Sequence, residues 1–144
     1  IDMDLARTAL QDIIAEKHKI ITADTIVILD GDILEKPKDR DDAIRMLHRL
    51  SGRKHKVVTA VVLTSREKQN EFSVTSVVDF AELSDQEITF YVDTYKPFDK
   101  AGAYGIQEWI GYIGVRGIEG SFYNVRGLPV QRLYQDLGTM GELL

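Results

Sequence analysis

The chain has 144 residues, of which 44% are hydrophobic and 28% are charged, a balance typical of a folded domain rather than a disordered or fibrous chain. A net charge of −5, with no basic run longer than residues 53–56, argues against a surface for nucleic acid or for acidic membranes. The absence of cysteine excludes disulfides and thiolate metal sites. We expect one domain over residues 1–144, located in the cytoplasm, and the start at Ile1 rather than Met suggests an N-terminal truncation.

Residues 20–29 are almost all β-branched or aliphatic, which predicts a strand buried on both faces. Asp24 interrupts this run. A buried carboxylate needs a cation, hydrogen-bond donors or a metal to compensate for lost hydration. Two interpretations stay open: a structural Asp bonded to backbone amides, or a functional carboxylate.

A tight turn at residues 30–32 follows this strand and predicts a hairpin. The returning segment carries Lys36 back alongside the strand that holds Asp24. A carboxylate and an ammonium on adjoining strands could together hold a metal and a phosphate. They could equally form one salt bridge.

The remaining chain alternates helical and extended patterns. Helical spacing of apolar residues predicts helices over residues 3–18, 39–50, 84–93 and 129–138. Asp39 is expected to cap the second of these helices, and Ser84 with Glu87 forms a capping box for the third. Residues 56–64 and 71–83 predict a long β-hairpin. Residues 99–127 are rich in glycine, which favours turns over regular helix, and they contain neither a phosphate-loop nor a dinucleotide fingerprint.

A set of short motifs, in a fixed order along nearly the whole chain, resembles the Maf family of nucleoside triphosphate pyrophosphatases. The matching residues are Ala23-Asp24-Thr25, Leu34 with Lys36-Pro37, Met46-Leu47, Leu50-Ser51-Gly52, His55, Val58-Thr59, Tyr91-Val92, Asp99-Lys100-Ala101-Gly102, Gly105-Ile106-Gln107, Ile118-Glu119-Gly120-Ser121, Asn124-Val125 and Gly127-Leu128-Pro129. Each motif alone is weak, and their common order carries the resemblance.

The resemblance implies an α/β fold of the inosine triphosphate pyrophosphatase type, with a mixed central β-sheet flanked by helices and a nucleotide cleft. It implies hydrolysis between the α and β phosphates, giving a monophosphate and pyrophosphate, with Mg²⁺ or Mn²⁺ as the divalent cation. Asp24 matches the family's catalytic carboxylate and is expected to act as base or metal ligand. Lys36 matches the phosphate-binding lysine, and a homodimer is also implied.

Two positions resemble the branch of the family that acts on dTTP and UTP. Thr25 follows the catalytic carboxylate, and Gln107 occupies a position where the branch acting on 7-methylguanosine triphosphate tends to differ. Because an amide offers a donor and an acceptor, we hypothesise that Thr25 and Gln107 select thymine and uracil. The competing interpretation is that Gln107 only ties down a glycine-rich loop.

Several other residues keep two interpretations. Asp99 and Lys100 either border the site or form a local ion pair. The histidines show no ligand spacing, so no metal is assigned to them.

The family's opening Ser-x-Ser-Pro-Arg-Arg motif, which binds the triphosphate, has no counterpart in this chain, and Thr8 stands where a lysine is expected. Two alternatives to dTTP/UTP hydrolysis therefore stay open. One is a non-catalytic nucleotide-binding regulator of septum formation, a process to which family members are linked. The other is a pyrophosphatase for 7-methyl-GTP.

Overall fold

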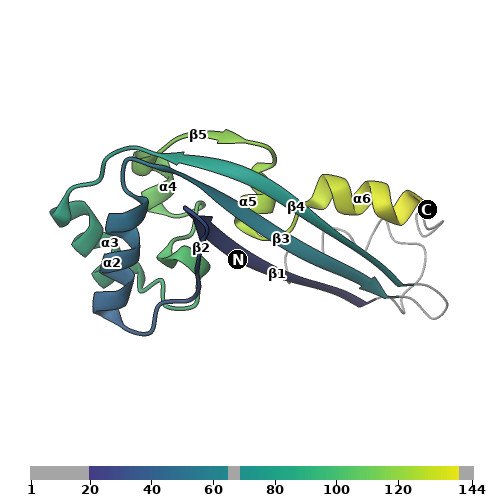
Figure 1. Cartoon of the computed structure of the whole chain (residues 1–144), viewed down its shortest axis with the longest axis horizontal. Coiled ribbons are helices and arrows are strands. Elements are labelled where there is room, and N and C mark those ends of the chain that lie inside the picture. The colour runs from purple at the N-terminus through teal and green to yellow at the C-terminus, as the bar shows by residue number, and fades with distance from the viewer. Residues whose placement is uncertain (1–19, 65–68, 140–144) are drawn as a thin grey trace.

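The computed structural model describes residues 20–64 and 69–139, and these form one five-stranded sheet with helices packed against it (Figure 1). The strand order is β2-β1-β3-β4-β5. The strands are β1 (Ile20–Leu29), β2 (Asp32–Leu34), β3 (Lys54–Thr64), β4 (Gln69–Phe80) and β5 (Val115–Glu119). The predicted α/β class is confirmed, and the predicted helix over residues 3–18 lies outside the described residues.

All four strand pairings among the described residues are antiparallel, whereas the resemblance implied a mixed sheet. The connections explain this pattern. A tight turn joins β1 to β2, and only four residues of sequence separate β3 from β4; connections this short join antiparallel neighbours. Helix α2 (Arg40–Leu50) then carries the chain from β2 across to the other side of β1, where β3 pairs with β1.

The helices gather at two places along the sheet. They are α2, α3 (Asp85–Tyr95), the 3-10 turn η1 (Ala101–Ala103), α4 (Trp109–Gly114), α5 (Phe122–Arg126) and α6 (Val130–Thr139). Figure 1 shows α2 and α3 beside each other at one end of the sheet and α6 near the tip of the β3–β4 hairpin. The glycine-rich section is therefore not built of turns alone, because it contains η1, α4, β5 and α5. No helix within residues 20–64 and 69–139 is long and apolar enough to cross a lipid bilayer.

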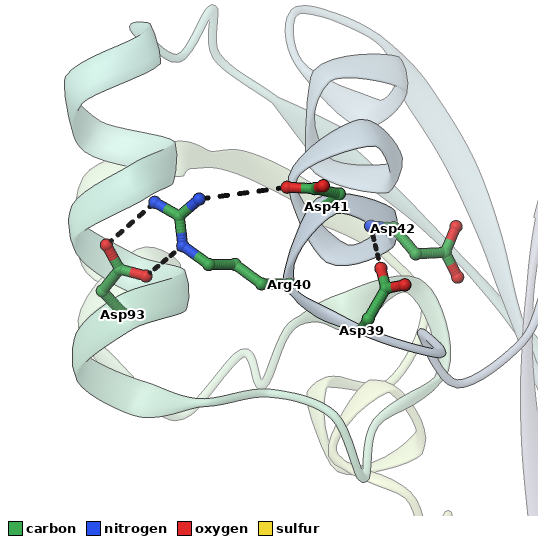
Figure 2. Close-up of polar contacts among 5 residues, drawn as sticks. All are labelled: Asp39, Arg40, Asp41, Asp42 and Asp93. Carbon is green, nitrogen blue, oxygen red and sulfur yellow. Dashed lines mark hydrogen bonds and ion pairs between the residues drawn. The ribbon is translucent and has the colours of Figure 1, made fainter.

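The predicted helix caps are confirmed. Asp39 accepts a hydrogen bond from the backbone N–H of Asp42 at 2.8 Å, and Ser84 and Glu87 form the reciprocal capping box. Figure 2 shows a further tie, in which the guanidinium of Arg40 on α2 bonds both carboxylate oxygens of Asp93 on α3, at 2.7 and 3.1 Å. The hydrogen bond and charge of Arg40 hold the pKa of Asp93 below its usual value. Arg40 thus joins two helices rather than simply facing solvent.

Strand β1 differs from the prediction of burial on both faces. Its inward face, which includes Ile21, Val27 and Leu29, is buried, but Asp24 on the opposite face is exposed. The same face of the paired strand β3 is also open to solvent, since Ala60, the register partner of Asp24, is exposed although strands flank it on both sides. The Asp24 carboxylate is therefore hydrated and needs no buried compensating partner.

Two apolar clusters cover the inward face of the sheet. The larger lies between the sheet and helices α2, α3 and α4, with Leu47, Phe80 and Tyr91 fully buried in it. The smaller lies under α6 and contains Leu63, Phe72 and Leu133 among others. Between them the same face carries a buried polar band made of Thr59, Ser76 and Asn124, with the half-buried Thr25 at its edge. These four residues form the polar band.

Candidate functional site

A cavity of about 350 Å³ lies beside β1, at the edge of the polar band. All four residues singled out from the sequence line it, namely Asp24, Thr25, Lys36 and Gln107. Its other lining residues are Ala23, Val27, Val57, Asp99, Lys100, Ala101, Tyr104, Gly105, Val125 and Gly127. The structure thus brings together residues that are up to 104 positions apart in the chain, from Ala23 to Gly127.

The predicted hairpin is confirmed, and it places Lys36 near the strand that holds Asp24. The pairing of Val27 with Leu34 aims the chain after β2 back along β1, and Lys36 comes directly beyond β2. Both residues are exposed, and within the described part of the chain no ion pair joins them. The salt-bridge alternative is therefore not observed, and both charged groups are available to a ligand in the cavity.

The segment from Asp99 to Glu108 supplies a second cation. The Lys100 ammonium lies 3.1 Å from the Asp99 carboxylate and 3.9 Å from Glu108, and only 16% of its side chain is exposed. Partial burial acts to raise the pKa of Asp99, but the hydrogen bond and charge of Lys100 outweigh it, so the net pKa lies below the usual value. Both interpretations of this pair hold at once, because the two residues form an ion pair and also border the cavity.

A buried tyrosine fixes Glu108 on the far side of that ammonium. The Tyr91 hydroxyl donates to Glu108 Oε1 at 2.7 Å and accepts from the backbone N–H of Gly105 at 3.0 Å. Burial, followed by the hydrogen bond to Glu108, raises the pKa of Tyr91 far above its ordinary value, so it stays a neutral donor. The cavity wall at Gly105 and Lys100 is therefore anchored to helix α3.

The turn η1 lies directly against β1 because of Gly102. This residue has φ +70°, and a Cβ at its position would come within 2.9 Å of the Val27 side chain. Its backbone N–H donates to the carbonyl of Glu35 at 3.3 Å, which ties η1 to the chain just after β2. Only glycine gives both the left-handed backbone and this close approach.

Thr25 and Gln107 are polar residues in the lining of the cavity. Thr25 Oγ1 lies 2.9 Å from Thr59 Oγ1 on the paired strand β3. The Oε1 atom of Gln107 is buried and has no hydrogen-bond partner in the structure. A buried amide oxygen without a donor is costly unless a ligand supplies one. Gln107 therefore does not simply tie down its own loop through Oε1.

Comparison with known proteins decides the family. The profile of the family described as Maf-like protein matches residues 2–140 of this chain. The chain belongs to the Maf family.

Several Maf relatives share more than half of their aligned residues with it. A dTTP/UTP pyrophosphatase of Porphyromonas gingivalis is 59% identical over 123 residues, which are 85% of this chain and 62% of the relative. A dTTP/UTP pyrophosphatase of Phocaeicola vulgatus is 63% identical over 118 residues, 82% of this chain and 61% of the relative. One from Bacteroides thetaiotaomicron is 56% identical over 129 residues, 90% of this chain and 67% of the relative. The chain spans about three fifths of the length of the first two relatives.

The oxygen donors of the cavity fit the divalent cation implied for Maf proteins only if the substrate supplies further ligands. Among the described residues no group of three or more His, Cys, Asp or Glu side chains could hold a metal by itself. Magnesium, however, commonly binds through one or two carboxylates, with waters and substrate phosphates as its other ligands. The exposed carboxylate of Asp24 beside a cavity with two lysines fits that mode of binding.

Thr59 and Asn124, which lie behind the lining of the cavity, were matched to family motifs in the sequence but were given no role there. Thr59 is fully buried behind Thr25, and Asn124 is fully buried where α5 meets β3 and β4. A signal for Thr59 exists, because it is a polar residue in the middle of the apolar run that predicts β3, as Asp24 is in β1. No local signal places Asn124, whose contacts come from strands about 50 residues or more away.

His55 belongs to the buried structure of the Maf fold rather than to the cavity. Its Nε2 lies 2.6 Å from the Tyr104 hydroxyl, while its buried Nδ1 has no partner in the structure. Burial lowers the pKa of His55 from 6.5 to about 4. The prediction that no metal binds here stays untested.

This shift predicts a loss of stability in acid. Above pH 6.5 His55 is neutral in both the folded and the unfolded chain. Below pH 6.5 it becomes protonated in the unfolded chain, whereas in the folded chain it stays neutral down to about pH 4. The free energy of unfolding should therefore fall by up to about 3 kcal/mol between these pH values on account of His55. Urea denaturation at several pH values should show a smaller fall for His55→Gln than for the unchanged protein. Exchange of the exposed His48 for Gln is the matched control, and equal falls in both variants would contradict the role of His55.

Proposed function

We propose that this chain forms the core of a nucleoside triphosphate pyrophosphatase that hydrolyses dTTP and UTP to the monophosphate and pyrophosphate. The observation that carries the proposal is one cavity lined by an exposed carboxylate, two lysines and an amide whose buried oxygen has no partner. The names of the relatives from three species supply the substrates. The proposed reaction consumes one water for each α–β phosphoanhydride bond that breaks.

The two lysines of the cavity would hold the triphosphate. Lys36 is exposed and forms no ion pair within the described ranges, so its full charge is available to phosphate oxygens. Lys100 is held between Asp99 and Glu108, which fixes the position of its ammonium. Charge-assisted contacts of this kind are among the strongest polar interactions with phosphate.

Asp24 would act on the attacking water. Its carboxylate is hydrated and accepts no hydrogen bond from another described residue, so it is free to take the proton of a water molecule or to ligate a cation. The attacking water forms the new P–O bond, its proton passes to Asp24, and pyrophosphate leaves with the electrons of the broken P–O bond. Bound Mg²⁺ or Mn²⁺, held by Asp24 and phosphate oxygens, would offset the negative charge that the water must approach.

Gln107 and Thr25 would face the base. Thymine and uracil present carbonyl oxygens that accept hydrogen bonds and one ring N–H that donates. An amide can match both kinds of group, and a buried amide oxygen without a partner gains most from a ligand that brings a donor. The cytoplasmic location expected from the sequence and the homodimer implied by the resemblance stay predictions.

The proposal is tested by product analysis of the full gene product that contains this chain. The protein is incubated with Mg²⁺ or Mn²⁺ and separately with dTTP, UTP, CTP, GTP and 7-methyl-GTP, and the products are separated by chromatography. We expect monophosphate and pyrophosphate from dTTP and UTP in preference to the other three. Preference for 7-methyl-GTP would instead support the other branch, and nucleotide binding without any product would support the regulatory alternative.

A further inference from the structure

Two threonines face each other across β1 and β3 at the edge of the cavity. Thr25 and Thr59 are direct partners in the strand register, and their hydroxyl oxygens lie 2.9 Å apart. Thr25 is half-buried and lines the cavity, while Thr59 is fully buried behind it. Thr59 therefore reaches a ligand only through Thr25.

The direction of the hydrogen bond between them follows from a third oxygen. Thr59 Oγ1 also lies 3.1 Å from the backbone carbonyl of Asn124, which can only accept. A hydroxyl has a single proton. If Thr59 gave that proton to Thr25, its oxygen and the Asn124 carbonyl would be two buried acceptors in contact with no proton between them. Thr59 must therefore donate to Asn124, and Thr25 must donate to Thr59.

The carbonyl that decides this direction is held firmly. The Asn124 side-chain amide donates to the carbonyls of Val57 and Val74 at 3.2 and 3.0 Å and contacts Ser76 Oγ at 3.0 Å. Its own backbone N–H donates to Ser121 Oγ at 3.1 Å. With Asn124 fixed between β3, β4 and α5, Thr59 has little freedom to reorient.

Thr25 therefore offers the cavity lone pairs and no proton. We propose that Thr59 is a positioning residue for base selection, because it holds the Thr25 hydroxyl as an acceptor that takes the N3–H of uracil or thymine. Cytosine presents a lone pair at N3, which this acceptor repels. The inference rests on the proposed function, since it requires the base of a pyrimidine nucleotide to lie against Thr25.

The sharpest test compares UTP with CTP, whose bases have nearly the same shape and differ in the hydrogen-bonding pattern of this edge. In Thr59→Val the Thr25 proton loses its acceptor and can turn toward N3 of cytosine. We expect the ratio of kcat/KM for UTP to that for CTP to fall about tenfold in the full gene product, the size of one hydrogen bond. Thr59→Ser should keep the original ratio because it keeps the hydroxyl. Thr75→Val, an identical exchange at an exposed position of β4, is the matched control.

If Thr59→Val does not fold, a second variant tests the same proposal. Thr25→Val removes the acceptor itself from a half-buried position and should lower the same ratio to a similar extent. A ratio that stays unchanged in either folded variant, in a protein that prefers UTP, overturns the role of Thr59 and leaves the proposed function intact. Absence of any UTP hydrolysis by the unchanged protein overturns both.

Discussion

Exchange of Asp24 for Asn is expected to lower kcat for dTTP and UTP about a thousandfold, within the range contributed by a general base. Asn has nearly the same shape as Asp but cannot accept a proton from water at neutral pH, and it is a poor ligand for a hard cation. Asp24 is exposed and makes no contact on which the fold depends, so the variant should remain folded. The measurement is product formation under saturating nucleotide, with thermal denaturation to verify the fold.

Asp32→Asn is the matched control for this experiment. Asp32 is also exposed, lies on the neighbouring strand β2 and bonds Arg49 at 2.9 Å, but it does not line the cavity. Its exchange should leave kcat within about twofold, since it touches no group in the proposed chemistry. If Asp24→Asn kept at least half of the original kcat, its role as base or metal ligand would be wrong.

Replacement of Gly111 by Ala is expected to lower the free energy of unfolding by about 3 kcal/mol. A Cβ at this position would overlap the backbone carbonyl oxygen of Ile106 and would lie 2.7 Å from its carbonyl carbon. Because backbone cannot rotate away as a side chain can, the segment before α4 must shift. The change is measured by urea denaturation of the two proteins under the same conditions.

The same substitution should also disturb the site, since Ile106 directly precedes Gln107. A displaced Gln107 would weaken preference for dTTP and UTP more than it weakens turnover in general. Gly117→Ala is the control, because nothing lies within 4 Å of a Cβ there and its φ is not in the left-handed region. If both variants had the same free energy of unfolding, the backbone at Ile106 would move aside with little loss of stability, and the predicted effect of Gly111→Ala would be wrong.

Local features of the fold could be predicted from the sequence because their causes are local. The caps at Asp39 and Ser84 depend on residues three positions apart, and the β3–β4 hairpin follows from two β-rich runs separated by a short polar turn. The residues of the site were predicted instead from the resemblance to a family, which rests on the order of short motifs along the chain. Asp24 and Gln107 lie 83 residues apart, and no spacing rule places them in one cavity.

Other features depend on contacts that no local pattern encodes. Asp24 is exposed because it lies on the solvent-facing side of the sheet, and residues 20–29 look equally apolar whether or not another element covers that side. The direction of the Thr25 hydroxyl is set by a carbonyl on α5, 65 residues beyond Thr59. The sequence shows that a hydroxyl is present but leaves open which partner takes its proton.

The position of the polar band has a consequence for folding itself. It keeps the cluster under α6 apart from the cluster under α2 and α3, so residues 20–64 and 69–139 form two hydrophobic clusters on one sheet face rather than one continuous core. The cavity borders both clusters. Of its lining residues, Ala23 packs on the smaller cluster and Val27 belongs to the larger. A ligand bound in the cavity would contact both clusters. Ligand binding would therefore stabilise the packing that connects the two clusters, and that packing would in turn favour ligand binding.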